Sequence, residues 1–217
     1  MSIFDETPPI RPKAEARRQQ ILDAACACVR REGFHGASMA DIAKAADLSV
    51  GQIYRYFENK EAMIAAIVAQ DLAEMREKFA ELETSSPSLT EAVIDQCSES
   101  LERHYDPDRA ALMLEVLAEA ARNPRVAAIV READAAERAL PGALLDRARA
   151  AGCSETEVAA RIEVLSMVFD GMVARTVNNP DSDRAAIAQV LRPVLRLLLG
   201  DTPLIPAADL SPTPMAP

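Results

Sequence analysis

Residues 38–60, SMADIAKAADLSVGQIYRYFENK, hold the side chains of this chain best suited to bind a partner. Two serines each begin a short helical pattern, because a serine hydroxyl at an N-cap accepts a hydrogen bond from a backbone N–H of the first turn. Ser38 precedes Asp41, whose charge suits the positive end of a helix, and Ser49 precedes Gln52, which completes an S-x-x-Q capping box. The pattern predicts two short helices joined by a tight turn, the helix-turn-helix geometry whose second helix enters the DNA major groove.

The neighbouring segments predict helices that pack this motif onto a core. Ile42, Ala43 and Ala46 form a narrow apolar face, and their small side chains let another helix approach closely. Upstream, a helix runs to about Glu32, and downstream an apolar stripe predicts a long helix over 60–83. Asp47 lies in the turn, where Asp tolerates a left-handed backbone better than most residues do.

The run A-x-x-A-D-L-S-x-G-x-x-Y-x-Y-F-x-x-K resembles the DNA-binding segment of the TetR family of bacterial transcriptional regulators. The matching residues are Ala43, Ala46, Leu48, Ser49, Gly51, Tyr54, Tyr56, Phe57 and Lys60. Upstream, Gly33-Phe34 resembles the connection that follows the first helix of that family, and the likeness covers residues 14–65. Asp47 departs from the family pattern, since many members carry Gly there. Beyond residue 65 only the length and the helical pattern agree.

This resemblance implies how the second helix would meet double-stranded operator DNA. The candidates for contacts with base edges are Val50, Gly51, Gln52 and Arg55. The candidates for contacts with phosphates are Ser38, Lys60 and either Tyr54 or Tyr56. A glutamine can bond adenine through two hydrogen bonds, and such a pair discriminates by about 1–3 kcal/mol. Lys60 begins a helix, where backbone amides also favour an anion.

The rest of the chain predicts an all-α protein with two functional domains. Residues 13–60 would form the DNA-binding domain and 61–200 a ligand-binding and dimerisation domain. A flexible arm, 1–12, and a disordered Pro-rich tail, 201–217, flank them. Pro141 should break or kink the segment 124–151, and the last two helices should span about 154–178 and 182–199.

The resemblance also implies a homodimer and a small-molecule effector. Two-fold symmetry would place two recognition helices on a near-palindromic operator. The candidates for the dimer interface, on the last two helices, are Leu165, Phe169, Leu191, Val194, Leu195 and Leu198. The candidates for the effector pocket are Leu101, Met113, Leu117, Met167 and Met172. Both sets also fit the alternative of plain core within a monomer.

The charge of the chain is uneven in a way that suits DNA binding. The net charge is −10, yet residues 11–60 hold nine Lys and Arg against six Asp and Glu, so 9 − 6 gives +3 there and −13 for the remainder. Attraction to phosphates acts over about 8–10 Å at physiological salt, so the local excess matters more than the total.

Catalytic and metal-binding patterns are absent from the sequence. It lacks G-x-S-x-G, P-loop, G-x-G-x-x-G and H-E-x-x-H motifs, and its two histidines, His35 and His104, are far apart. Four cysteines (26, 28, 97 and 153) show no zinc spacing, so packing is their simplest role and a thiol sensor the alternative. The N-terminus lacks the apolar segment of a signal peptide, and no apolar run is long enough to span a membrane, which predicts a cytoplasmic protein.

Taken together, these features predict a sequence-specific transcriptional regulator without a cofactor or enzymatic activity. The preferred hypothesis is a repressor that a small-molecule effector releases from its operator. One alternative is an activator or ligand-independent regulator on the same fold. The other is a helical adaptor or enzyme that merely contains a helical hairpin.

Overall fold

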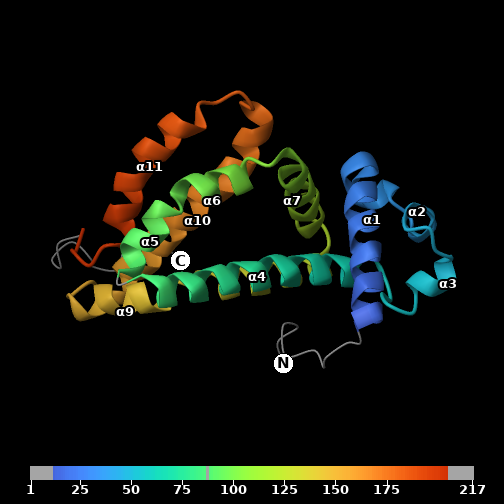
Figure 1. The fold of residues 1–217 in the computed structure, drawn as a ribbon, viewed down its shortest axis with the longest axis horizontal. Helices are drawn as coiled ribbons and strands as arrows, with labels where there is room; N and C mark the ends of the chain where they lie inside the picture. The colour runs from blue at the N-terminus through green and yellow to red at the C-terminus, as the bar shows by residue number, and fades with distance from the viewer. Residues whose placement is uncertain (1–11, 87, 205–217) are drawn as a thin grey trace, which may run out of the picture. The chain divides into compact units, whose positions relative to one another are not determined.

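The computed structural model describes residues 12–86 and 88–204, and every regular element within them is a helix, which confirms the all-α prediction (Figure 1). The helices are α1 (Pro12–Gly36), α2 (Met39–Ala45), α3 (Val50–Ile53), α4 (Lys60–Ser85), α5 (Leu89–Asp95), α6 (Cys97–His104), α7 (Pro107–Ala120), α8 (Pro124–Arg138), α9 (Gly142–Ala150), α10 (Glu155–Asn178) and α11 (Arg184–Leu199). They form two compact units. Unit 1 holds the described residues up to Glu77 together with Asp106–Glu137, and unit 2 holds Lys78–Tyr105 and the described residues from Arg138 onwards.

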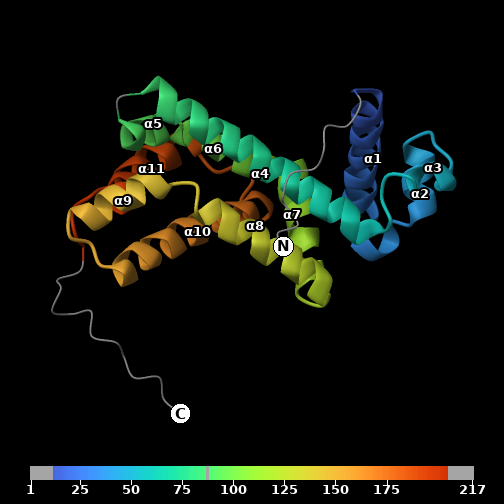
Figure 2. The same ribbon diagram turned by 90° about the horizontal axis from the view of Figure 1, so that it is seen from below.

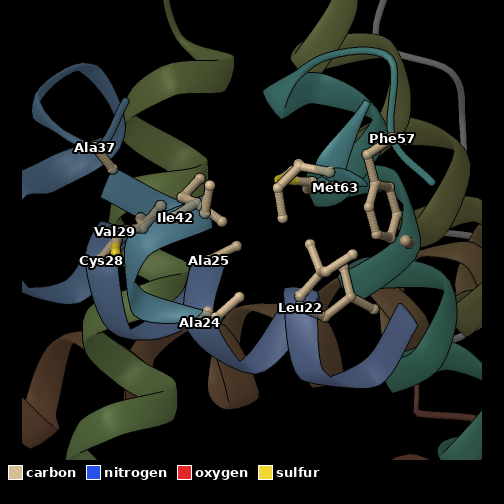
Figure 3. Packing of buried hydrophobic residues seen from close by; sticks show 14 residues of the cluster. Leu22, Ala24, Ala25, Cys28, Val29, Ala37, Ile42, Phe57 and Met63 are labelled. Atoms are coloured by element: carbon tan, nitrogen blue, oxygen red, sulfur yellow. The ribbon is translucent and has the colours of Figure 1, made fainter. Parts of the chain in front are cut away.

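In unit 1, α2 and α3 lie next to each other on one side of α1 (Figures 1 and 2). Their shared core includes Ile42, Ala43 and Ala46, which confirms the narrow apolar face predicted for α2. Figure 3 shows Leu22 of α1 and Met63 of α4 gathered in this core. The helix predicted to end at about Glu32 does break there, because Gly33 adopts a non-helical backbone with φ 73° and ψ 166° before the chain runs on through Gly36.

Helices α7 and α8 complete unit 1. Asp106 and Pro107 begin α7 as an N-cap followed by Pro, and the Asp106 carboxylate accepts the Arg109 N–H at 2.8 Å. A cluster that includes Phe34, Ile64 and Val116 joins α7 and α8 to α1 and α4. The predicted functional boundary at residue 60 therefore falls inside this compact unit, and the functional division stays a prediction.

In unit 2, α11 packs against α5, α6, α9 and α10. The break predicted at Pro141 is confirmed, since α8 ends at Arg138 and α9 begins at Gly142. The buried Arg161 side chain of α10 donates to the Gly200 and Thr202 carbonyls at 2.7 and 2.6 Å, so the chain just after α11 is held on α10. Apart from Pro12 and residues 201–204, the predicted arm 1–12 and tail 201–217 lie outside the described residues.

The described helices include none that is both long enough and apolar enough to cross a membrane.

The turn between α2 and α3 carries the first testable prediction. Asp47 has φ 52°, and it is the one non-glycine residue with positive φ in the described part of the chain. A left-handed backbone costs an L-residue roughly 1–2 kcal/mol, and glycine escapes that cost. Asp47 is exposed, so replacing it removes no core packing. We expect Asp47→Gly to raise the free energy of unfolding by up to about 1 kcal/mol in urea titrations. Asp47→Val should lower it, and equal stabilities of the two variants would contradict the prediction.

Candidate nucleic-acid interface

Two reciprocal capping boxes fix the starts of α2 and α3. At α2, the Ser38 hydroxyl accepts the Asp41 N–H at 3.1 Å, and the Asp41 carboxylate accepts the Ser38 N–H at 3.1 Å. Hydrogen bonds from the Ser38 hydroxyl and then from the Ser38 N–H hold the pKa of Asp41 below its ordinary value. At α3, Ser49 and Gln52 form the box predicted from the sequence, with the Gln52 Oε1 atom 2.9 Å from the Ser49 nitrogen. The two capping boxes thus fix the first turn of each helix and the direction in which the chain enters it.

Helix α3 has one buried side and one exposed side. Ile53 and Phe57 are 0% and 3% exposed, and they anchor the segment in the core of unit 1. The helical turn continues past α3, since the Phe57 N–H donates to the Ile53 carbonyl at 3.0 Å. The predicted contact residues of this segment are all exposed to solvent, namely Val50, Gly51, Gln52, Tyr54, Arg55 and Tyr56. Ile53 and Phe57 therefore anchor the segment in the core, and its polar and aromatic side chains face the solvent.

Gly51 leaves an open approach to the backbone of this face. No described atom lies within 4 Å of the position where a Cβ atom would stand on Gly51, after its chain neighbours and its own helix backbone are set aside. Glycine in a helix costs about 0.5–1 kcal/mol relative to alanine. The packing of the described residues therefore does not require a glycine at this position, and its predicted contact with DNA stays a prediction.

Lys60 makes contacts within unit 1 that the sequence did not predict. Its ammonium donates to the Phe34 carbonyl at 2.5 Å and to the Ala37 carbonyl at 2.9 Å, and it lies 4.5 Å from the centre of the Phe34 ring. The side chain is directed into unit 1 and joins α4 to the end of α1. Lys60 thus has a structural role in unit 1, and its predicted contact with a phosphate stays a prediction.

The structure shows two contacts of α1 side chains that the sequence did not predict. Gln20 donates to the Ala46 carbonyl at 2.6 Å, and the Arg18 guanidinium lies 5.0 Å from the centre of the Phe57 ring. Both hold α1 against the helix-turn-helix. Arg18 belongs to a basic cluster in the sequence, which also holds Arg11, Lys13 and Arg17, whereas nothing in the spacing singled out Gln20. Lys13 and Arg17, from the same cluster, are exposed and add positive charge to this end of the chain.

The cysteines do not form a reactive site in the described residues. Cys28, Cys97 and Cys153 are buried and Cys26 is partly buried. Burial raises the pKa of the Cys26 thiol to about 11 and raises that of Cys97 as well. The thiolate is the species that reacts with oxidants, so these protonated thiols suit packing rather than redox sensing.

The predicted effector and dimer residues lie on different parts of the chain. Leu101 and Met172 share one buried cluster in unit 2 with the partly buried Leu165 and Phe169. Met113 and Leu117 are on α7 in unit 1, and Met167 of α10 is 61% exposed. Among the dimer candidates, Leu191 and Leu195 belong to the core of unit 2, Leu198 is half-buried and Val194 is 37% exposed.

Two capped short helices, a tight turn and a second helix with a buried anchor and an open outer face define a helix-turn-helix DNA-binding protein. A model of the family described as "Bacterial regulatory proteins, tetR family" matches residues 21–67. The HTH-type transcriptional regulator UidR of Escherichia coli is 36% identical over 121 residues, which cover 55% of this chain and 59% of UidR. The HTH-type transcriptional repressor AcnR of Corynebacterium diphtheriae is 30% identical over 172 residues, 77% of this chain and 84% of AcnR.

The fold agrees with these relatives. The solved structure of Salmonella enterica GusR superposes with a TM-score of 0.71 at 28% identity, over 89% of this chain and 99% of GusR. The chain belongs to the TetR family of bacterial regulatory proteins, which confirms the resemblance drawn from residues 14–65. The match to UidR spans less than two thirds of that relative. The family is one of transcriptional regulators, and the enzyme alternative is set aside.

Proposed function

We propose that this chain is a transcriptional repressor that binds a near-palindromic operator in the cytoplasm as a homodimer and leaves it when a small molecule binds. The proposal that the chain binds DNA is supported by the exposed side chains of residues 50–56. Ile53 and Phe57 anchor this segment in the core, and Gly51 leaves its backbone accessible. Relatives named as repressors, AcnR among them, support the direction of regulation.

The geometry of Gln52 favours one mode of base recognition. Its Oε1 atom accepts hydrogen bonds from the Ser49 nitrogen and hydroxyl at 2.9 and 3.0 Å. A two-bond contact with adenine needs both the oxygen and the amino group of the side chain, so it would break this capping box. A single bond from the Gln52 amino group to an acceptor in the major groove keeps the box intact. We therefore propose that Gln52 donates one hydrogen bond to a base, and that Arg55, Tyr54 and Tyr56 contact the DNA beside it.

Binding to the DNA upstream of the chain's own gene tests this proposal. Fluorescence anisotropy should give tighter binding to that DNA than to random DNA, with an affinity that falls steeply as salt rises. Gln52→Ala should weaken operator binding by about 2- to 13-fold, the equivalent of 0.5–1.5 kcal/mol for one hydrogen bond, and leave binding to random DNA little changed. Ser49→Ala is the matched control, because it removes the cap and keeps the Gln52 amino group. Equal affinities of the unmodified chain for the two DNAs would contradict sequence-specific binding.

The effector is proposed to bind in the buried cluster of unit 2 that contains Leu101 and Met172. A structural neighbour, the regulator FadR of Bacillus subtilis, was solved in complex with stearoyl-CoA, and it superposes with a TM-score of 0.64 at 22% identity. Stearoyl-CoA is therefore a reasonable first probe for binding at this cluster. An effector that weakens operator binding by a given factor must itself be weakened by operator DNA by the same factor. A ligand whose affinity ignores the operator is not the effector, and a chain that no ligand releases would be a ligand-independent regulator.

A further inference from the structure

The backbone of one residue at the end of α1 is held from two other helices. Gly33 breaks α1, and the next residue, Phe34, donates its N–H to the Glu115 carboxylate of α7 at 3.0 Å. The Phe34 carbonyl accepts from the Lys60 ammonium of α4 at 2.5 Å. An acidic side chain thus holds the donor of this residue and a basic side chain holds its acceptor, and both bonds are stronger than neutral ones.

A second carboxylate of α7 holds the neighbouring residue. Glu119 follows Glu115 by four residues, so both project from the same face of the helix. Glu119 is 2% exposed, and its Oε2 atom lies 3.1 Å from Nε2 of His35 and 2.9 Å from Nε of Arg122. Burial acts to raise the pKa of Glu119, but hydrogen bonds from Asn123 and Arg122 and the neighbouring positive charges outweigh it and lower that pKa. Helix α7 therefore contacts the connector, residues 33–37, at two successive residues through carboxylate side chains.

The connector leads directly into the DNA-binding helices. Ser38, the N-cap of α2, comes four residues after Phe34, and the Ala37 carbonyl is the second acceptor of Lys60. With only this short stretch between them, the direction of the Phe34 peptide sets the entry of the chain into α2. Gly33 is the point at which the backbone can pivot, since its φ of 73° is open to glycine and strained for other residues.

We propose that Glu115 is a positioning residue for DNA binding, which transmits the position of α7 to the helix-turn-helix through the Phe34 N–H. This inference rests on the proposed function, and it deepens that function by naming an element other than α4 that regulates the DNA-binding face. If α7 moves and withdraws Glu115, the Phe34 peptide keeps its bond to Lys60 and loses its bond to Glu115. Helices α2 and α3 then lose the orientation that fits the operator.

The test compares Glu115→Ala with Glu115→Gln in the full-length protein, at a temperature where circular dichroism shows both folded. Glu115→Ala removes the acceptor, and we expect operator affinity to fall by between about 2- and 30-fold with binding to random DNA unchanged. Glu115→Gln keeps a side-chain oxygen at the same reach and should retain most of the operator preference. Amide hydrogen exchange supplies a readout without DNA, because the Phe34 N–H should exchange faster in Glu115→Ala alone.

Asp71→Ala is the control for a general loosening of α7. It removes the carboxylate of α4 that bonds Arg109 of α7 at 2.6 Å, and it leaves the connector untouched. If Asp71→Ala and Glu115→Ala reduce operator preference equally, Glu115 acts only through packing and the proposal is wrong. The same holds if Glu115→Ala binds the operator like the unmodified chain. An unmodified chain without operator preference would instead overturn the proposed function, and this inference with it.

Discussion

Replacing Gly51 by leucine is expected to weaken operator binding by about 5- to 150-fold or more while the protein stays folded. The site of the new side chain is open, because no described atom comes within 4 Å of a Cβ placed there. Removing a helical glycine should raise the free energy of unfolding by up to about 1 kcal/mol. On the DNA side the added butyl group would stand between the α3 backbone and the groove. Overpacking of this kind costs roughly 1–3 kcal/mol or more, which corresponds to at least about 5- to 150-fold in affinity.

Opposite changes in stability and in DNA affinity are what separate this prediction from simple misfolding. Thermal unfolding and fluorescence anisotropy should be measured on the same preparation. Gly142→Leu is a matched control, since a Cβ at Gly142 also meets no described atom within 4 Å but the residue begins α9 in unit 2. It should leave operator affinity unchanged. Wild-type affinity in Gly51→Leu would show that α3 does not approach DNA by its first turn.

The DNA-binding region could be predicted well from the sequence because its signals are local. The capping box at Ser49, the apolar positions of α2 and the break at Gly33 each depend on neighbours within a few residues. Asp47 was expected to accept a left-handed backbone, and its φ of 52° confirms this. Such features follow from backbone geometry and helix periodicity, so one sequence is enough to place them.

Long-range contacts could not be predicted in the same way. The Phe34 and Ala37 carbonyls that accept from the Lys60 ammonium are 26 and 23 residues away in sequence, and no local pattern points to them. Glu115 has no local signature at all, since its partner is the Phe34 N–H, 81 residues away in sequence. A single charged side chain fits many surroundings, and only the packed fold decides which of them it meets.

The apolar pattern of α11 shows the same limit. Its stripe predicted a dimer interface that included Leu191, Val194 and Leu195. In the fold, Leu191 and Leu195 face the core of unit 2 and are 8% and 2% exposed. A charge at either position would be buried without a partner inside the protomer, at a cost large enough to unfold it. Periodicity identifies an apolar stripe, and it does not distinguish the side that faces the protomer from the side that faces a second copy.

Exposed apolar side chains of α10 and α11 are the better guide to the proposed dimer interface. Val190, Val194 and Leu197 are 69%, 37% and 55% exposed, and at 100° per residue they fall within about 60° of one another on α11. On α10, Val164 and Met167 are 42% and 61% exposed. In a dimer interface built from two helices of each protomer, such stripes are buried against the same helices of the second protomer.

Val190→Glu is therefore expected to split the dimer without unfolding the protomer. The new carboxylate would be solvated in a monomer and desolvated in the interface, a difference of several kcal/mol and so of more than about 100-fold in the dimerisation constant. A monomer presents one recognition helix, so operator affinity should fall by a further 10²- to 10⁴-fold through the loss of two-site binding. Sedimentation velocity at micromolar concentration measures the first effect and anisotropy the second.

Ala185→Glu is the control, because this exposed residue lies on the same helix about 120° or more from the apolar stripe and should leave the dimer intact. A Val190→Glu variant that remains dimeric would place the interface elsewhere. A wild-type chain that sediments as a monomer would remove the support for two half-sites.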